Sequence, residues 1–170
     1  GPVEVSGGTI RVQDEGSQLV ALALTAASPI GAGERWLDLC AGPGGKTALL
    51  AAIARQHGAT LEANEIVPVR ARLVRKALRA VPGEIVVHEQ DGRELAASRP
   101  GEFDRILVDA PCTGLGALRR RPEARWRKSP ADVAELVPLQ TDLLSAALDA
   151  LAPGGIVAYV TCSPHLAETT

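Results

Sequence analysis

Short apolar runs alternate with longer amphipathic segments along almost the whole chain, and this alternation constrains the fold more than any other feature. Such runs, bounded by glycine, proline or polar residues, are typical of strand–helix–strand units whose strands pair in parallel. The sequence predicts five strands, at residues 35–39, 60–63, 84–88, 103–108 and 156–160. It predicts helices at residues 17–27, 46–57, 69–80 and 130–150, the last segment being two helices joined near Pro138. We therefore expect an α/β fold with a mostly parallel sheet and helices on both faces.

Composition fits one folded domain and excludes several other classes of protein. The 170 residues are 46% hydrophobic and 22% charged, close to the globular average, so residues 1–170 are expected to form a single domain. No apolar run approaches the ~18 residues that a membrane span needs, and no leader is recognisable, so no membrane partner is expected. The three scattered cysteines predict reduced thiols and a cytoplasmic location, and no spacing of His and Cys predicts a metal site. The sequence does not indicate an oligomeric state.

Polar residues follow every predicted strand. In open parallel sheets, ligands bind beyond the carboxyl ends of the strands, where the loops converge. We therefore expect one site that collects the loop at residues 40–47 after the first strand and, in chain order after the other strands, Glu65, Asp91, Asp109, Cys112 and Cys162.

The loop at residues 40–47, CAGPGGKT, matches neither common phosphate-binding pattern. A P-loop needs a glycine where Cys40 stands, and a dinucleotide fingerprint needs one where Thr47 stands. The loop keeps the feature that both share, since small residues expose backbone N–H groups at a helix N-terminus to an anion. Glu65 follows at about the 20-residue spacing at which an acidic side chain binds a ribose. The pattern favours S-adenosylmethionine; the alternatives are a tight turn without a ligand and a P-loop-like nucleotide-binding protein.

The three cysteines are expected to differ in role. Cys112 and Cys162 each follow a strand directly, and the fourth and fifth strands are expected to be neighbours, so both thiols would face one cleft. They are therefore predicted to be a pair of working thiols rather than a disulfide. Cys40 is predicted to pack in the interior and to contact a ligand only through its backbone. The three histidines are predicted to be structural.

A basic strip, RRRPEARWRK at residues 119–128, directly follows the Cys112 loop. It carries six positive residues in a chain of net charge −2, and it could bind RNA phosphates while its tryptophan stacks on a base. The alternative is a solvated loop whose tryptophan packs on the core. The candidate RNA contacts are Arg119, Arg120, Arg121, Arg125, Trp126 and Arg127.

Taken together, these motifs resemble those of the RNA cytosine-5 methyltransferases, in particular the branch that acts on bacterial 16S ribosomal RNA. The resemblance rests on LDLCAGPGGKT (37–47), FDRILVDAPCTGLGALRRRPEARWR (103–127) and YVTCS (159–163), in the family's order, together with Glu65, Asp91 and VQDEGSQL (12–19). It implies a class I, Rossmann-like methyltransferase domain with S-adenosylmethionine as cofactor. It also implies an RNA substrate, with ribosomal RNA favoured over transfer RNA.

The resemblance implies a role for each motif residue. Cys162 would add to carbon 6 of cytosine, Cys112 would assist release of the methylated RNA, and Asp109 would hydrogen-bond the base or the cofactor. Glu65 would bind the ribose of the cofactor and Asp91 its adenine. The methionine part would lie against the backbone of Cys40, Ala41, Gly42, Pro43, Gly44, Gly45 and Lys46.

The sequence also departs from the family pattern. Members usually continue with further strands after the threonine–cysteine loop and carry an RNA-binding domain before the catalytic one, so we expect the catalytic domain alone, without its C-terminal strands. The acidic–acidic–asparagine run that often follows the nucleophile reads Ala167-Glu168-Thr169, which puts any role for that run in doubt. A binding module that keeps the fold without turnover is a further hypothesis.

Overall fold

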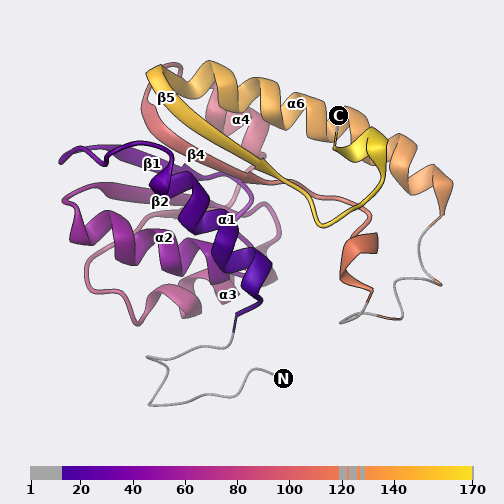
Figure 1. Ribbon diagram of the computed structural model, residues 1–170, viewed down its shortest axis with the longest axis horizontal. Coiled ribbons are helices and arrows are strands. Elements are labelled where there is room, and N and C mark those ends of the chain that lie inside the picture. The colour runs from indigo at the N-terminus through magenta and orange to yellow at the C-terminus, as the bar shows by residue number, and fades with distance from the viewer. Residues whose placement is uncertain (1–12, 119–121, 123–125, 127–128, 170) are drawn as a thin grey trace.

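The computed structural model, which describes residues 13–118, 122, 126 and 129–169, contains one five-stranded sheet (Figure 1). Every pairing in this sheet is parallel, in the order β3-β2-β1-β4-β5. The predicted α/β class and parallel sheet are therefore confirmed. The strands are β1 (Arg35–Asp38), β2 (Thr60–Asn64), β3 (Val87–His88), β4 (Phe103–Asp109) and β5 (Leu151–Val160).

Helices cover both faces of the sheet because successive side chains of each strand point to opposite faces. Trp36 and Leu107 lie in one apolar cluster and Leu37 and Ile106 in the other. The first cluster packs under α1 (Glu15–Ala26), α2 (Gly45–Gln56) and α3 (Pro68–Leu78), and the second under α4 (Gly92–Ala97) and α6 (Pro130–Ala150) (Figure 1). Two short 3-10 turns, η2 (Leu115–Ala117) and η3 (Leu166–Glu168), lie beyond the ends of β4 and β5.

The segment predicted as two helices is one helix of 21 residues, so the joint near Pro138 is wrong. A proline inside a helix removes one hydrogen bond, but tertiary packing can outweigh that loss. Here Leu143 packs into the second apolar cluster, and the Gln140 side chain hydrogen-bonds the Pro111 carbonyl at 2.8 Å. Both contacts fix the helix just after the proline, which keeps it continuous.

The remaining differences concern short or irregular elements. The third strand is only Val87–His88 instead of residues 84–88, because only these two residues pair with β2. β5 begins at Leu151, before the predicted strand at residues 156–160, and its register against β4 shifts between Phe103 and Arg105, which accommodates Gly154 at φ +83°. Helix α4 was not predicted, since six residues are too few to show a helical period.

Two kinds of feature are absent from the described ranges. None of the helices there combines the length and apolar character needed to cross a membrane. Nor do those residues include a group of three or more His, Cys, Asp or Glu side chains arranged around a metal ion.

Candidate active site

The glycine-rich loop leaves β1 at the carboxyl edge of the sheet and packs directly on α3. Gly44 adopts φ +103°, which disfavours any residue with a side chain. A Cβ there would lie 2.7 Å from Ala77 Cβ and 2.8 Å from Val74 Cα, both on α3. The loop is closed by the Gly44 N–H, which donates to the Ala41 carbonyl at 2.7 Å. Glycine is therefore required at position 44 for both conformation and contact.

The Glu65 carboxylate lies against this loop. The Gly42 N–H donates to Glu65 Oε2 at 3.0 Å, and the Val67 N–H donates to Glu65 Oε1 at 2.9 Å. Arg70 Nη2 donates to the Gly42 carbonyl at 2.7 Å, while its Nε lies 3.4 Å from Glu65 Oε2. A Cβ on Gly42 would come within 2.1 Å of that carboxylate oxygen. Glu65 thus sits at the predicted place beside the loop; its contact with a ribose stays a prediction.

Two buried polar atoms beside the loop lack a partner among the described residues, and both suit a ligand that offers donors and acceptors. Gln13 Nε2 is one, and it lies 3.3 Å from the position that a Cβ on Gly45 would take. Asp38 Oδ1 is the other, while its Oδ2 accepts from the Thr47 hydroxyl at 2.7 Å. Burial raises the pKa of Asp38 to about 7 against the opposing hydrogen bond from Thr47. Such atoms, with the exposed backbone of the loop, fit S-adenosylmethionine.

Asp91 follows β3 and begins α4. Its carboxylate accepts from the Arg93 N–H at 2.9 Å and from Arg93 Nη2 at 2.6 Å. The hydrogen bonds from the Arg93 side chain hold the pKa of Asp91 below its usual value. The Asn64 amide, which donates to the Leu39 carbonyl at 3.2 Å and the Gln90 carbonyl at 3.1 Å, ties this segment to the end of β1. Asp91 therefore borders the same edge of the sheet, and its contact with adenine stays a prediction.

Cys112 and Cys162 meet as the topology predicted. β4 pairs with β5 up to Asp109 and Val160, and the two chains then deliver sulfurs whose Sγ atoms lie 3.4 Å apart. The hydrogen bond from Cys112 is the largest influence on Cys162 and lowers its pKa to about 6; the same bond raises the pKa of Cys112. Cys162 is therefore the sulfur that carries the thiolate near neutral pH, which is the reactive form of a cysteine.

An ion pair stands between the thiols and the glycine-rich loop. Lys46, in the first turn of α2, donates from Nζ to Asp109 Oδ2 at 2.7 Å. Both charges act on Cys162: Asp109 raises the pKa of its thiol and Lys46 lowers it. The thiol pair, the ion pair and the loop therefore share one edge of the sheet.

The remaining predicted residues lie less centrally. Cys40 packs against the second apolar cluster, and burial raises the pKa of its thiol, which agrees with the predicted interior role. Trp126 is 85% exposed, so it does not pack in the core, and its stacking on a base stays a prediction. Five of the candidate RNA contacts lie outside the described residues: Arg119, Arg120, Arg121, Arg125 and Arg127.

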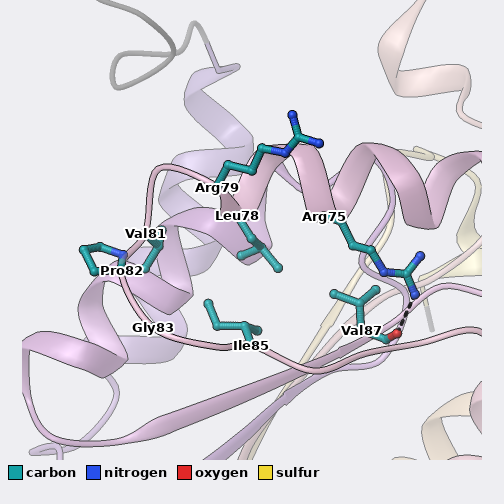
Figure 2. A pocket seen from close by; sticks show the side chains of 8 residues that line it. All are labelled: Arg75, Leu78, Arg79, Val81, Pro82, Gly83, Ile85 and Val87. Atoms are coloured by element: carbon teal, nitrogen blue, oxygen red, sulfur yellow. Dashed lines mark hydrogen bonds between the residues drawn. The ribbon is translucent and has the colours of Figure 1, made fainter.

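A groove of about 390 Å³ lies elsewhere, between α3 and the segment that leads into β3 (Figure 2). Leu78, Val81 and Ile85 line it together with Arg75 and Arg79. None of the predicted site residues lines this groove, and β3 is at the opposite edge of the sheet from β5. It is therefore separate from the thiol pair.

The parallel sheet, the glycine-rich loop after β1 and the acidic residues at the following strand ends define a Rossmann-like, S-adenosylmethionine-dependent methyltransferase fold. Within that class, the chain belongs to the family described as 16S rRNA methyltransferase RsmB/F, which matches residues 27–170. The resemblance found in the motifs is thereby confirmed, and S-adenosylmethionine is the cofactor of this family.

Two curated relatives illustrate the match. A Mycobacterium tuberculosis protein named "Putative methyltransferase Rv1407" is 62% identical over 165 residues, which are 97% of this chain and 35% of that protein. Ribosomal RNA small subunit methyltransferase B of Salmonella paratyphi B is 40% identical over 158 residues, 92% of this chain and 35% of the relative. The chain thus spans about a third of the length of these relatives.

A solved structure is similar along most of the chain. NSun6 from Pyrococcus horikoshii, crystallised with SFG, an S-adenosylmethionine analogue, matches with a TM-score of 0.77 at 26% identity. The match covers 93% of this chain and 39% of NSun6. The architecture is therefore that of a methyltransferase whose structure holds a cofactor analogue.

Proposed function

We propose that this chain is the catalytic domain of an RNA methyltransferase that transfers a methyl group from S-adenosylmethionine to carbon 5 of a cytosine. The observation that carries the proposal is the 3.4 Å approach of Cys112 Sγ and Cys162 Sγ, from separate loops, beside the Lys46–Asp109 ion pair. Small-subunit ribosomal RNA is the proposed substrate, supported by the family description and by the name of the Salmonella relative. We place the reaction in the cytoplasm.

Two thiols serve this reaction because carbon 5 of cytosine is a poor nucleophile. Addition of the Cys162 thiolate to carbon 6 makes the ring an enamine, whose carbon 5 can attack. A proton must reach ring nitrogen 3 as the sulfur adds, and in this proposal the Lys46 ammonium supplies it through Asp109, which accepts its hydrogen bond. The target base must be single-stranded or turned out of its stack to reach these groups.

S-Adenosylmethionine, when bound, supplies the methyl group that carbon 5 takes. Residues 40–46, Glu65 and Asp91 would hold it. Once Cys162 is bonded to carbon 6, the Cys112 thiol would give its proton to the Lys46–Asp109 pair, which has just donated one, and become a thiolate. After methyl transfer this thiolate accepts the proton of carbon 5, the carbon 6–sulfur bond breaks, Cys162 leaves as a thiolate, and nitrogen 3 loses its proton to solvent. The ring thereby regains its aromatic character, and the second thiol explains how the RNA is released.

The other hypotheses differ in their support. Membership of a methyltransferase family removes the basis for a P-loop nucleotide-binding protein, for which Gly45-Lys46-Thr47 was the only sequence support. Transfer RNA stays an alternative substrate, because the motifs do not separate the two RNAs. A binding module without turnover is the remaining alternative, and it makes a distinct prediction.

A covalent trap tests the proposal in the full-length protein that contains this chain. With substrate RNA and S-adenosylmethionine, Cys112→Ala should accumulate a protein–RNA adduct on a denaturing gel, because the adduct forms but is not released. Cys162→Ala, alone or combined with Cys112→Ala, should form no adduct and should lower methyl transfer by roughly 10³-fold or more.

The covalent trap is run in parallel with 16S ribosomal RNA and with transfer RNA. The methylated base is identified by nuclease digestion and mass spectrometry. An adduct with transfer RNA alone would show that transfer RNA, and not ribosomal RNA, is the substrate. No adduct with either RNA would support the inert binding module, and methylation at a position other than carbon 5 would reject the proposed chemistry.

A further inference from the structure

The carboxylate of Glu168 lies at the centre of a buried polar cluster that no step above uses. Glu168 is 1% exposed, although it belongs to the short turn η3. Its Oε1 accepts from the Thr113 N–H at 2.8 Å and from Gln140 Nε2 at 3.0 Å. Its Oε2 accepts from the Thr113 hydroxyl at 2.6 Å and from the Ser163 hydroxyl at 2.5 Å. Four donors from three segments therefore converge on one side chain.

The donors are the direct neighbours of the two thiols. Thr113 follows Cys112 in the chain, and Ser163 follows Cys162. The hydroxyls of Thr113 and Ser163 also lie 3.1 Å apart, so the two loops meet at the Glu168 carboxylate and at each other. Each thiol loop is thus attached to the same anchor through the residue after its sulfur.

Two more contacts fix this arrangement from outside. Gln140 on α6 donates both to Glu168 and to the Pro111 carbonyl, so α6 holds the segment before Cys112. The Gly116 N–H donates to the Cys162 carbonyl at 2.8 Å, an approach that a Cβ on Gly116 would block at the same distance. The anchor therefore belongs to a rigid contact between the two loops.

We propose that Glu168 is the positioning residue of the thiol pair: its carboxylate holds the Cys112 and Cys162 loops at the separation at which one sulfur hydrogen-bonds the other. The proposal deepens the proposed function, on which it rests for the purpose of the pair. The positioning of the two loops by Glu168 does not itself depend on which reaction the thiols carry out. Glu168 touches neither sulfur and is not a catalytic residue.

A carboxylate suits this place better than any neutral side chain. It offers acceptor sites for four donors at once, whereas an amide must present donors on one side. Burial alone would raise the pKa of Glu168, but the hydrogen bonds from Ser163 and Thr113 outweigh it and lower the pKa, which keeps the carboxylate ionised. Without this side chain, the Thr113 N–H would lose its acceptor in the interior, and the Gln140 amide would keep only the Pro111 carbonyl.

The direct test is the pH profile of Cys162 alkylation by iodoacetamide in the full-length protein, resolved by peptide mass spectrometry. Cys162 faces Cys112, Asp109 and Lys46, and the wild-type midpoint is expected near pH 6. Glu168→Ala should move the midpoint up by about two units, toward that of an ordinary thiol, because the sulfurs separate. A side chain that only stabilised the fold would leave this midpoint in place.

Three further variants keep the test decisive. Glu168→Gln should restore a midpoint closer to the wild type, since its oxygen can face the Thr113 N–H while its NH₂ group faces the two hydroxyls, which can accept. Ser163→Ala removes one donor only, so it should fold even if Glu168→Ala does not, and it should shift the midpoint up by about one unit. Glu94→Ala, an exposed glutamate on α4, should leave it unchanged.

The outcomes separate this proposal from the proposed function, because alkylation needs neither RNA nor methyl transfer. A midpoint that stays near pH 6 in folded Glu168→Ala and in Ser163→Ala would overturn the positioning role. A wild-type midpoint near that of a free thiol would do the same, since no coupled pair would exist. A shifted midpoint in a protein that forms no RNA adduct would support the positioning role and reject the cytosine chemistry.

Discussion

The two ends of the sheet differ in how they use polar side chains. At the amino end, charged groups satisfy one another: Arg105, 1% exposed, donates to Glu34 Oε2 at 2.8 Å and to the Leu24 carbonyl at 2.8 Å. Arg99 there pairs with Glu62 at 2.6 Å. At the carboxyl end, Glu65 and Glu168 instead accept hydrogen bonds from loop backbones, and the Lys46–Asp109 ion pair stands beside the thiols. Stability and chemistry are therefore assigned to opposite ends of the same strands.

The difference between the two ends of the sheet shows how a parallel sheet can hold a reactive cysteine at its carboxyl end. A buried arginine costs much free energy unless it is fully paired, and the amino end supplies that pairing away from solvent. The carboxyl end keeps Cys162 exposed and gives it a lowered pKa through Cys112. Because apolar clusters fill the space between the two ends, a change at one end should leave the other largely intact.

The largest expected effect is a loss of unfolding free energy when the buried arginine at the amino end of the sheet is replaced. Arg105→Leu leaves the Glu34 carboxylate without its buried partner and should cost about 3–5 kcal/mol of unfolding free energy, measured by urea denaturation. Arg35→Ala is the matched control: its ion pairs at 3.3 and 3.4 Å are partly exposed, so it should cost about 1 kcal/mol or less. A folded Arg105→Leu protein with an altered Cys162 pH profile would show that the ends are coupled.

The next largest effect is expected at one of two glycines with similar backbone conformations, as a loss of stability and of S-adenosylmethionine affinity. Gly44→Ala, at the carboxyl end, should lose about 2 kcal/mol or more and weaken S-adenosylmethionine binding at least tenfold, because its Cβ meets α3. Gly154→Ala in β5 has φ +83° but open space around its Cβ, so it should lose about 1 kcal/mol and leave binding unchanged. Calorimetric titration checks both; equal loss of affinity in the two variants would contradict a separate carboxyl end.

The smallest effect is the acid sensitivity of the amino end. Hydrogen bonds from Arg99, then His88, lower the pKa of Glu62 from 4.5 to about 2. A folded-state pKa below the unfolded one stabilises the protein above pH 4.5, and this contribution is lost as the pH falls from 4.5 toward 2. Urea denaturation at several pH values should therefore show about 1–2 kcal/mol less acid loss in Glu62→Gln than in the wild type. Glu94→Gln should retain the wild-type slope, and an unchanged slope in Glu62→Gln would refute the assignment.

Periodic features of the sequence predicted the framework of the molecule well. The alternation of apolar runs located all five strands, and the parallel order brought Cys112 and Cys162 together, because neighbouring strands end at one edge. Pro138 was misjudged because local propensity omits the packing that holds α6 straight through it. The short helix α4 carries too few residues for any period to be visible.

The parts of the site that escaped prediction depend on contacts between distant segments. Asp38 could have been suspected, since it is an acidic residue inside an apolar strand next to the glycine-rich loop. Glu168 stood out only as part of the altered acidic run at residues 167–169, whose role was left in doubt, because its donors come from residues 28 and 55 positions earlier in the chain and from Ser163. A lone glutamate near a chain of polar residues is usually solvated, and only the folded structure shows it buried.

The chain order of the thiol centre has a consequence for biosynthesis. Glu168 leaves the ribosome after Cys112, Cys162 and strands β1 to β5. Since domains are made from their N-terminus at about 5–20 residues per second, the nascent sheet can assemble while its sulfurs are still unpaired ordinary thiols. The reactive centre would then be switched on only after η3 has emerged, which would protect the growing protein from premature alkylation and oxidation.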